Sequence, residues 1–393
     1  MRSWLGRWRR RLLGGDLRRA VAGARASRAA LMMYSTAAFR RARVPERHQN
    51  QSQQRELAQA LAEHGYVVDA VDFDERRTAG LRARYDLVVD LHPDTHTLYE
   101  GHRAPGARTI AYMTGCDPAH AAAAERARLD ALERRRGVRL APRRAVRPIP
   151  AAVYPTFDAM FLMGGRATLA SYAPYRLPPV HHLPNNGWDD LEPTDAAVRE
   201  PHRFLFLGSA GQVHKGLDLL LETFRDAPEL ELNVLSLYER EPDFVRAYAH
   251  ELFRLPNVHA GGFPDLRDPA FRALQARCGW MILPSCAEGQ AGTVTLALAY
   301  GLPCVVSTAC GFDDAELVTL PDCELPTLAR TARALAGESG RALAERSAVA
   351  RALYLQRYRP RHYAEAVRAA LDALHGAGAA SAASPRHSAG FAT

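Results

Sequence analysis

Two glycine-bearing loops in the second half of the chain carry side chains suited to binding a phosphorylated ligand. The first loop, 208–216 (GSAGQVHKG), follows an apolar run and precedes a helix-like segment. Its glycines would let backbone N–H groups approach phosphate oxygens, and Lys215 would bring a full charge to a diphosphate. The loop is neither G-x-G-x-x-G nor a Walker A sequence, which argues against hydride transfer and nucleoside-triphosphate hydrolysis. A structural turn with a surface lysine is the alternative interpretation.

Lys215 is the only lysine among 51 basic residues, and the rest are arginine. A chain with this bias uses arginine wherever either cation serves, so the lone lysine favours a site that needs a compact ammonium group. The alternative is that a single lysine codon has survived by chance and the residue has no special role.

The second loop, within 283–296 (LPSCAEGQAGTVTL), combines a carboxylate with two glycines at an expected helix start. Glu288 could hold a sugar hydroxyl while the amides around Gly289 and Gly292 approach a phosphate. The alternative is an ordinary acidic residue stabilised by the helix dipole. Each loop taken alone is a weak signal.

Short apolar runs alternate with helical segments on both sides of a polar, proline-rich break at 178–201. The runs have the composition of buried strands. The expected strands are 29–34, 67–71, 87–91, 109–113 and 157–163 before the break, and 204–207, 232–237, 258–260, 280–283 and 304–307 after it. The expected helices include 51–64, 327–335, 341–357 and 363–375. This order predicts an α/β protein with two Rossmann-like doubly wound domains that face a cleft, with ligand loops at the carboxyl ends of the strands.

The predicted organisation has five parts. They are a basic amphipathic N-terminal segment (1–28), an N-terminal domain (29–182), an interdomain linker (183–201), a C-terminal domain with C-terminal helices (202–375) and a disordered tail (376–393).

The net charge of +8 resides in the first 28 residues, which hold nine arginines and one acid, Asp16. The remainder of the chain has equal numbers of basic and acidic residues, which argues against nucleic acid as a partner. Trp4, Leu5, Trp8 and Leu12 recur at helical spacing beside the arginines, as in a helix that lies on an anionic membrane surface. A disordered basic arm is the alternative.

The six cysteines form no C-x-x-C pair and no Cys/His spacing typical of zinc. Because no secretory signal is visible, we expect reduced, mostly buried thiols, no metal, and a cytoplasmic protein that is peripheral on the inner face of the membrane if the N-terminal segment binds there. The uncharged stretch 289–312 is interrupted by Pro303 and glycines, so we expect a helix, a turn and a buried strand in place of a membrane span.

Together and in this order, the motifs resemble the donor-binding half of the family 4 glycosyltransferases, which have the GT-B fold. The resemblance rests on Lys215-Gly216 after a glycine-bearing strand end, on LPS-x-x-EG at 283–289 and on GLP-x-V-x-S at 301–307 followed by Gly311. The segment LPNNGWD at 183–189 is similar to the family's interdomain Pro-Asn-Gly-x-Asp. The likeness covers 183–315 well and the first half only in strand order and in a Gly-Tyr-x-Val-Asp strand.

The resemblance implies a hexosyltransferase that moves a sugar from a nucleotide-diphosphate sugar to a glycan, lipid-linked or protein acceptor, as in polysaccharide biosynthesis. It implies retention of anomeric configuration, no metal, and no cofactor beyond the nucleotide sugar as co-substrate. Lys215 would contact the diphosphate and Glu288 would orient the donor sugar. The donor-binding residues implied are Gly208, Ser209, Gly211, Lys215, Gly216, Glu288, Gly289, Gln290, Gly292 and Thr293.

Two positions depart from the family pattern. Ser209 stands where the family has an arginine that binds phosphate, and Leu296 stands where a second glutamate usually holds the ribose. Asp313 or Asp314 could replace a polar contact, and the sequence does not choose between them. The departures support an alternative function, a catalytically inactive GT-B-like binding or scaffold protein in envelope polysaccharide assembly. A sugar-nucleotide epimerase would need an acid/base cluster that is not apparent.

The N-terminal domain would supply the acceptor side of the cleft. His92 ends the strand 87–91 and is the third catalytic candidate, because a histidine there can contact a sugar or take up a proton. His48, Gln49 and Asn50 precede the first long helix, and Thr114-Gly115 follow the strand 109–113. Each of these is more often a cap or a satisfied polar group. The arginine-rich segment 126–147 could receive an anionic acceptor or a membrane, and a solvated helix face is the alternative.

Overall fold

The computed structural model describes residues 17–23, 25–39, 49–73, 75, 78–91, 99–144 and 146–382, with side chains described as far as residue 376. The amphipathic pattern predicted between Trp4 and Leu12 lies outside the described residues, as do His48 and His92.

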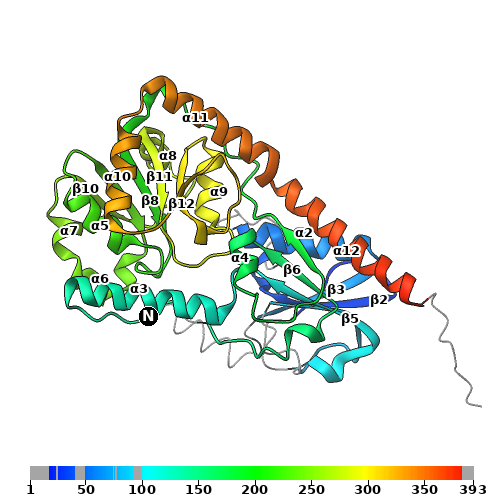
Figure 1. The fold of residues 1–393 in the computed structure, drawn as a ribbon. Coiled ribbons are helices and arrows are strands. Elements are labelled where there is room, and N and C mark those ends of the chain that lie inside the picture. Colours follow the sequence, from blue (N-terminus) through cyan, green and yellow to red (C-terminus); the bar gives the residue numbers. More distant parts are fainter. Residues whose placement is uncertain are drawn as a thin grey trace, which may run out of the picture.

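Two β-sheets form the framework of the molecule, and both are built mainly from parallel strands (Figure 1). The N-terminal sheet has the order β1-β3-β2-β4-β5-β6-β7, and only β1 is antiparallel to its neighbour. Its strands are β1 (Arg18–Ala22), β2 (Arg28–Tyr34), β3 (Tyr66–Asp72), β4 (Tyr85–Asp90), β5 (Arg103–Met113), β6 (Ala159–Met163) and β7 (Val180–Leu183). The predicted N-terminal doubly wound domain is therefore present.

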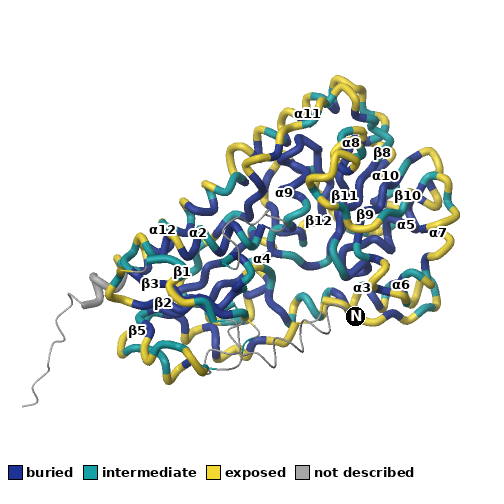
Figure 2. The backbone as a smooth tube through the Cα atoms, turned by 180° about the vertical axis from the view of Figure 1, so that it is seen from behind, coloured by how far each residue is buried: buried dark blue, intermediate teal, exposed yellow. Residues whose placement is uncertain are grey.

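The C-terminal sheet is parallel throughout and has the order β10-β9-β8-β11-β12-β13. Its strands are β8 (Glu200–Gly208), β9 (Glu231–Ser236), β10 (Val258–Gly262), β11 (Cys278–Leu283), β12 (Cys304–Ser307) and β13 (Val318–Leu320). All residues of β11 and β12 are buried because helices cover both faces of the sheet. Figure 2 shows these strands as a buried interior with exposed residues on the outer helices.

The helices complete two α/β domains. They are α2 (Gln49–Glu63), α3 (Pro118–Arg136), α4 (Arg166–Ala170), α5 (Leu217–Arg225), α6 (Pro242–Ala247), α7 (Ala249–Phe253), α8 (Pro269–Arg277), α9 (Gly292–Ala299), α10 (Leu325–Ala336), α11 (Gly340–Leu353) and α12 (Pro360–Ala382). The uncharged stretch after Gly289 forms α9, a turn and β12, as the sequence predicts. No helix in the described part of the chain is long and apolar enough to cross a membrane.

Three short strands were not predicted. One of them, β1, lies within 1–28, so part of the segment expected to be a separate amphipathic arm is instead an edge strand of the N-terminal sheet. The amide of Ala20 in β1 donates to Asp69 Oδ1 in β3 at 2.8 Å. The other two, β7 and β13, are also edge strands, and each is four residues or fewer.

The last helix, α12, corrects the predicted boundary at residue 375. It extends to Ala382, so the first residues of the expected disordered tail are helical. It also returns to the N-terminal domain, where it crosses α2 (Figure 1). Tyr363, Val367 and Leu371 are buried in the N-terminal core, and the hydroxyls of Tyr363 and Tyr112 are 2.8 Å apart. These apolar contacts place α12 with the N-terminal domain, although the chain enters it from the C-terminal one.

Helix α3 passes from the N-terminal domain to the C-terminal one, the reverse of the path taken by α12. It follows β5 of the N-terminal sheet, yet it lies along the C-terminal domain (Figure 1). Arg135 is 2.7 Å from Asp218 Oδ2 and 3.0 Å from Glu222 Oε2, both on α5. Leu129 and Leu132 of α3 belong to the C-terminal core. One face of the arginine-rich segment 126–147 therefore bridges the domains, while Arg126 and Arg134 are exposed, as the solvated-face alternative predicts.

Candidate functional site

The two predicted loops lie at one edge of the C-terminal sheet. Strands β8 and β11 are parallel neighbours, so the loops that follow them leave the sheet side by side. Gly216 begins the turn into α5 with φ of +78°, and a Cβ there would lie 2.6 Å from the carbonyl oxygen of Pro284. Glycine is therefore required for the loop of Lys215 to approach the loop of Glu288 this closely.

Lys215 and Glu288 form a buried ion pair. Lys215 Nζ lies 2.6 Å from Glu288 Oε1, and their side chains are only 7% and 10% exposed. Ser285 Oγ donates to the same carboxylate oxygen at 2.7 Å. Burial alone would raise the pKa of Glu288, but Lys215, His214 and Arg144 together outweigh this effect and hold the pKa at about 2. Glu288 is therefore ionised at neutral pH.

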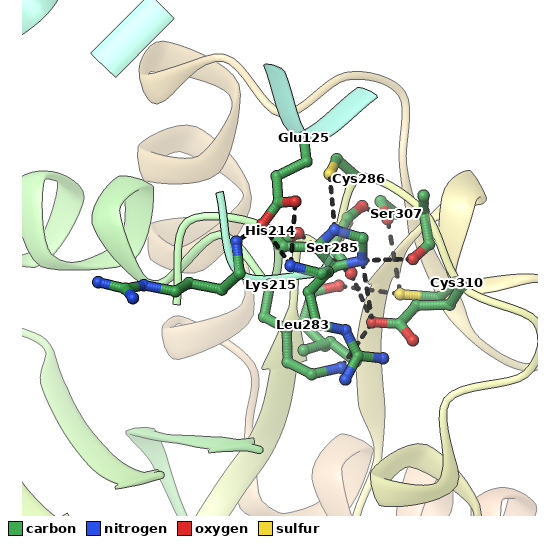
Figure 3. Close-up of polar contacts among 12 residues, drawn as sticks. Glu125, His214, Lys215, Leu283, Ser285, Cys286, Ser307 and Cys310 are labelled. Atoms are coloured by element: carbon green, nitrogen blue, oxygen red, sulfur yellow. Dashed lines mark hydrogen bonds and ion pairs between the residues drawn. The ribbon is translucent and has the colours of Figure 1, made fainter. Parts of the chain in front are cut away.

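His214 of the first loop also contacts the second loop, through Ala287 and Cys286 (Figure 3). Its Nε2 lies 2.6 Å from the carbonyl oxygen of Ala287, which can only accept, so Nε2 carries the hydrogen. Its Nδ1 is then free to accept from the Cys286 thiol at 3.6 Å. Burial lowers the pKa of His214 and raises the pKa of Cys286 to about 12, so both are neutral groups that fix the loops.

The amides of the first loop are not all available to a ligand. Glu241 accepts from the backbone N–H groups of Gly211 at 2.5 Å and Gln212 at 3.2 Å. The Gly211 amide, which was predicted to bind phosphate, is therefore already engaged by a buried carboxylate. Gly208 is also buried, and Ser209 accepts through its carbonyl from Gln212 Nε2 at 2.9 Å.

Part of the second loop serves the contact between the domains. A Cβ at Gly289 would lie 2.4 Å from the carbonyl oxygen of Thr114 in the N-terminal domain. The side chain of Gln290 accepts from the Asn185 amide at 2.7 Å. The carbonyl of Gly292, the first residue of α9, accepts from Gln49 Nε2 at 2.8 Å. Gln290 and Gly292, predicted to bind the donor, thus face the linker and α2.

Thr293, also predicted to bind the donor, lies in the first turn of α9 and is partly exposed. The carbonyl oxygen of its neighbour Gly292 is 2.9 Å from Thr295 Oγ1, which donates to it. No hydrogen bond of the Thr293 side chain to another described residue is present.

A cavity of about 410 Å³ lies between the domains at this point. Its lining includes Glu288 and Gly289 of the C-terminal domain, and Thr114 and Gly115 of the N-terminal domain, which pack against Gly289. Lys215 lies behind Glu288 and is not part of the wall. The lining residues are Leu91, Met113, Thr114, Gly115, Cys116, Pro118, Ala121, Arg143, Arg144, Val146, Ile149, His214, Ala287, Glu288 and Gly289.

The sequence analysis did not single out His214, Arg143 or Arg144 as site residues. The arginines belong to the arginine-rich segment, whose composition was the available signal. Their place at the cavity depends on the path of α3, which local sequence does not encode.

Neither Leu296, at the position of the second glutamate, nor the two candidate replacements, Asp313 and Asp314, line the cavity. Leu296 is 2% exposed and belongs to the C-terminal core. Asp313 Oδ2 accepts from the Arg166 amide at 2.8 Å across the domain seam. Asp314 is buried against Arg357, whose Nη1 is 2.7 Å from Asp314 Oδ1. The expectation that Asp313 or Asp314 supplies a ligand contact is therefore not supported by their positions.

The described residues contain no cluster of three or more His, Cys, Asp or Glu side chains placed to hold a metal ion. All six cysteines lie in described ranges and are free thiols, three buried and three partly buried. Metal independence stays a prediction.

Residues 201–344 match the family model described as glycosyl transferases group 1. A search of curated proteins finds no significant match. Among solved structures, the chain is similar to sucrose-phosphate synthase from Thermosynechococcus elongatus, with 14% identity, TM-score 0.61, and coverage of 90% of this chain and 100% of that one. HepE from Anabaena, solved with UDP and glucose, gives 14% identity, TM-score 0.58, and coverage of 88% and 99%.

TarM gives 11% identity and a TM-score of 0.51, with coverage of 73% of this chain but only 54% of TarM. The chain thus spans about half the length of TarM and nearly all of the other two. These similarities establish the architecture. The chain has the two-domain GT-B fold, and its C-terminal domain resembles the glycosyl transferases group 1.

Proposed function

We propose that the protein transfers a hexosyl group from a nucleotide-diphosphate sugar to a glycan, lipid-linked or protein acceptor hydroxyl in polysaccharide biosynthesis. The observation that carries this proposal is the Lys215–Glu288 pair at the interdomain cavity, within the segment that matches the glycosyltransferase family. The structural neighbour HepE has been solved with UDP-glucose.

The geometry gives each loop a role in this reaction. The Glu288 carboxylate can accept hydrogen bonds from donor-sugar hydroxyls, and the Lys215 ammonium can stabilise charge on the departing diphosphate. The bond from the anomeric carbon to the diphosphate oxygen breaks with its electron pair leaving on phosphate. The acceptor oxygen forms the new bond to that carbon, and its proton passes to the departing diphosphate oxygen. Thr114 and Gly115 line the part of the cavity that belongs to the N-terminal domain, where the acceptor would enter.

Retention of configuration and independence of metal belong to the proposal. Lys215 is a cation already present beside the cavity, so the leaving group has a stabilising charge from the chain itself. Attachment to the inner face of a membrane through the arginine-rich 1–28 remains a prediction from sequence alone.

A second candidate function is a GT-B-like scaffold without transferase activity. Two observations favour it: Glu241 occupies the amides of Gly211 and Gln212, and Leu296 is buried in the core. Ser209, which stands where the family has a phosphate-binding arginine, is a third observation in its favour. A scaffold protein would retain the GT-B fold but would not bind a nucleotide-sugar donor.

Turnover of candidate donors separates the two functions. The full chain would be incubated with UDP-glucose, UDP-N-acetylglucosamine and GDP-mannose, with and without EDTA and simple glycoside acceptors, and released nucleoside diphosphate would be measured. We expect release from one donor, unaffected by EDTA and lowered by about a hundredfold or more in Glu288→Gln. The exposed Glu316→Gln is the matched control and should keep full activity. Proton NMR of the product would report the anomeric configuration.

Absence of release from every donor, in protein that is folded by circular dichroism, would favour the scaffold. Equal release by wild type and Glu288→Gln would show that another site carries the activity.

A further inference from the structure

Lys215 is the one cation of the C-terminal domain that was predicted to meet the donor diphosphate. Lys215 is already paired with Glu288 at 2.6 Å, and Ser209 replaces a second cation. The diphosphate of a nucleotide sugar is strongly anionic, and it requires cationic or N–H partners when it enters a cavity. The amides of Gly211 and Gln212 are occupied by Glu241. Another cation must face this cavity if the donor is to bind tightly.

Arg144 lies where that cation is needed. It lines the cavity together with His214 and Glu288. Its side chain crosses the first loop, because a Cβ at Gly211 would lie 2.6 Å from Arg144 Cγ and 2.9 Å from Cδ. Its positive charge, together with the larger effects of Lys215 and His214, lowers the pKa of Glu288 against the opposing effect of burial.

Arg144 also differs from its neighbour in having an uncommitted charge. Arg143 is ion-paired with Asp243 and lies 4.0 Å from Glu241. Within the described residues, no acidic group lies within ion-pair distance of the Arg144 guanidinium. The residue is exposed to the cavity and its surroundings. An arginine in this state can form two parallel hydrogen bonds with phosphate oxygens without first breaking another pair.

The backbone of Arg144 is held in place from α3. Glu125 is a buried residue of α3, and its carboxylate accepts from the amides of Arg143 at 2.8 Å and Arg144 at 3.1 Å (Figure 3). Helix α3 is fixed in turn to the C-terminal domain by Arg135, which contacts Asp218 and Glu222. The turn that presents Arg144 therefore has a defined position relative to the Lys215 loop.

We propose that Arg144 is the second diphosphate-binding cation of this protein, reaching across from the segment between β5 and β6 to do what an arginine at position 209 would do. The inference rests on the proposed function, since it assigns a partner to the donor's diphosphate. It places donor binding under the control of both domains.

Isothermal titration calorimetry with the full chain tests this assignment. The probes are UDP, GDP, ADP, the corresponding nucleosides and inorganic pyrophosphate. We expect Arg144→Gln to weaken binding of the preferred nucleoside diphosphate and of pyrophosphate by about tenfold or more, with little change for the nucleoside. Arg144→Lys should recover part of the affinity. Arg139→Gln, which removes the same charge from an exposed position of the same segment, should leave binding within about twofold.

A compensating variant separates a phosphate contact from a structural role. Adding Ser209→Arg to Arg144→Gln should restore most of the lost affinity, because it returns a cation to the strand end beside the same phosphates. Thermal unfolding of every variant would verify the fold.

The outcomes distinguish the two proposals. Wild-type affinity in Arg144→Gln, or an equal loss in Arg139→Gln, would overturn the role of Arg144 and leave the proposed function intact. Binding of none of the nucleoside diphosphates by the wild type would overturn the proposed function, and the assignment of Arg144 with it.

Discussion

At the scale of single residues, the site depends on a lysine and a glutamate that neutralise each other in a nearly water-free position. Lys215 and Glu288 were both predicted from their motifs, because a lone lysine and an EG loop at strand ends are local features. Their direct contact was not predicted, since it depends on the positive φ of Gly216 and on the adjacency of β8 and β11. Arg144 could not be predicted, because its position depends on how α3 packs on another domain.

Removal of the Lys215 side chain should destabilise the folded protein, because it leaves the carboxylate of Glu288 buried and unpaired. We expect Lys215→Met to lower the free energy of unfolding by about 3 kcal/mol at pH 7. The double variant Lys215→Met with Glu288→Gln should recover a large part of that loss, because no charge then remains buried. Urea denaturation of the three proteins measures both quantities. Equal destabilisation of the single and double variants would show that the pair contributes no electrostatic coupling.

The same pair gives a pH dependence with a definite sign. The pKa of Glu288 is held at about 2 in the folded chain, below its ordinary value of 4.5. Its contribution to stability is therefore complete above about pH 4.5 and is lost as the pH falls toward 2. We expect the difference in unfolding free energy between wild type and Glu288→Gln to shrink by roughly 1–2 kcal/mol from pH 6 to pH 3. A difference that is constant or grows on acidification would contradict the ionised pair.

At the scale of elements, the central strands follow from sequence and the edge strands do not. FLFL in β8 and the apolar run of β11 are buried on both faces, so their composition alone marks them. RRAVA of β1 and VHHL of β7 are short and partly polar, and they become strands only by pairing with distant neighbours. The many charged residues of α3 favoured a solvent-exposed helix, yet Arg135 forms ion pairs with acidic residues on α5.

The loops at the domain seam pack backbone against backbone, which makes their glycines sensitive to substitution. A Cβ at Gly289 would lie 2.4 Å from the carbonyl oxygen of Thr114 and 2.7 Å from that of Met163. We expect Gly289→Ala to lower the free energy of unfolding by about 1–3 kcal/mol. Gly340→Ala, where a Cβ would meet no atom within 4 Å, is the matched control and should be neutral or slightly stabilising. Thermal unfolding compares the two, and equal melting temperatures would contradict the close packing of the seam.

At the scale of the whole molecule, the two domains are joined by more than the linker. Helix α3 leaves the N-terminal sheet to pack on the C-terminal domain, and α12 returns from the C-terminal domain to the N-terminal core (Figure 1). The order of strands and helices predicted two α/β domains and a cleft. It could not predict these exchanged helices, because a helix with an apolar face fits either domain and only tertiary packing selects one.

The exchange of α12 has a measurable consequence for stability. Leu371 of α12 is fully buried in the N-terminal core. We expect Leu371→Ala to lower the free energy of unfolding by about 2–4 kcal/mol, because it leaves a cavity at this contact. Glu365→Ala changes an exposed position of the same helix and should cost less than about 0.5 kcal/mol. Denaturant titration of both variants checks the prediction, and a Leu371→Ala protein as stable as wild type would place α12 elsewhere.

We propose above that the cavity beside Lys215 and Glu288 binds a nucleotide-diphosphate sugar. Thermal shift of the wild type and of Lys215→Ala with UDP, GDP, ADP and their sugar conjugates tests this claim most directly, because a ligand that binds the native state raises its melting temperature. We expect one nucleotide sugar to raise the melting temperature of the wild type by several degrees, and we expect Lys215→Ala to lose this shift. Absence of a shift with every ligand in folded protein, or an equal shift in both proteins, would contradict this proposal.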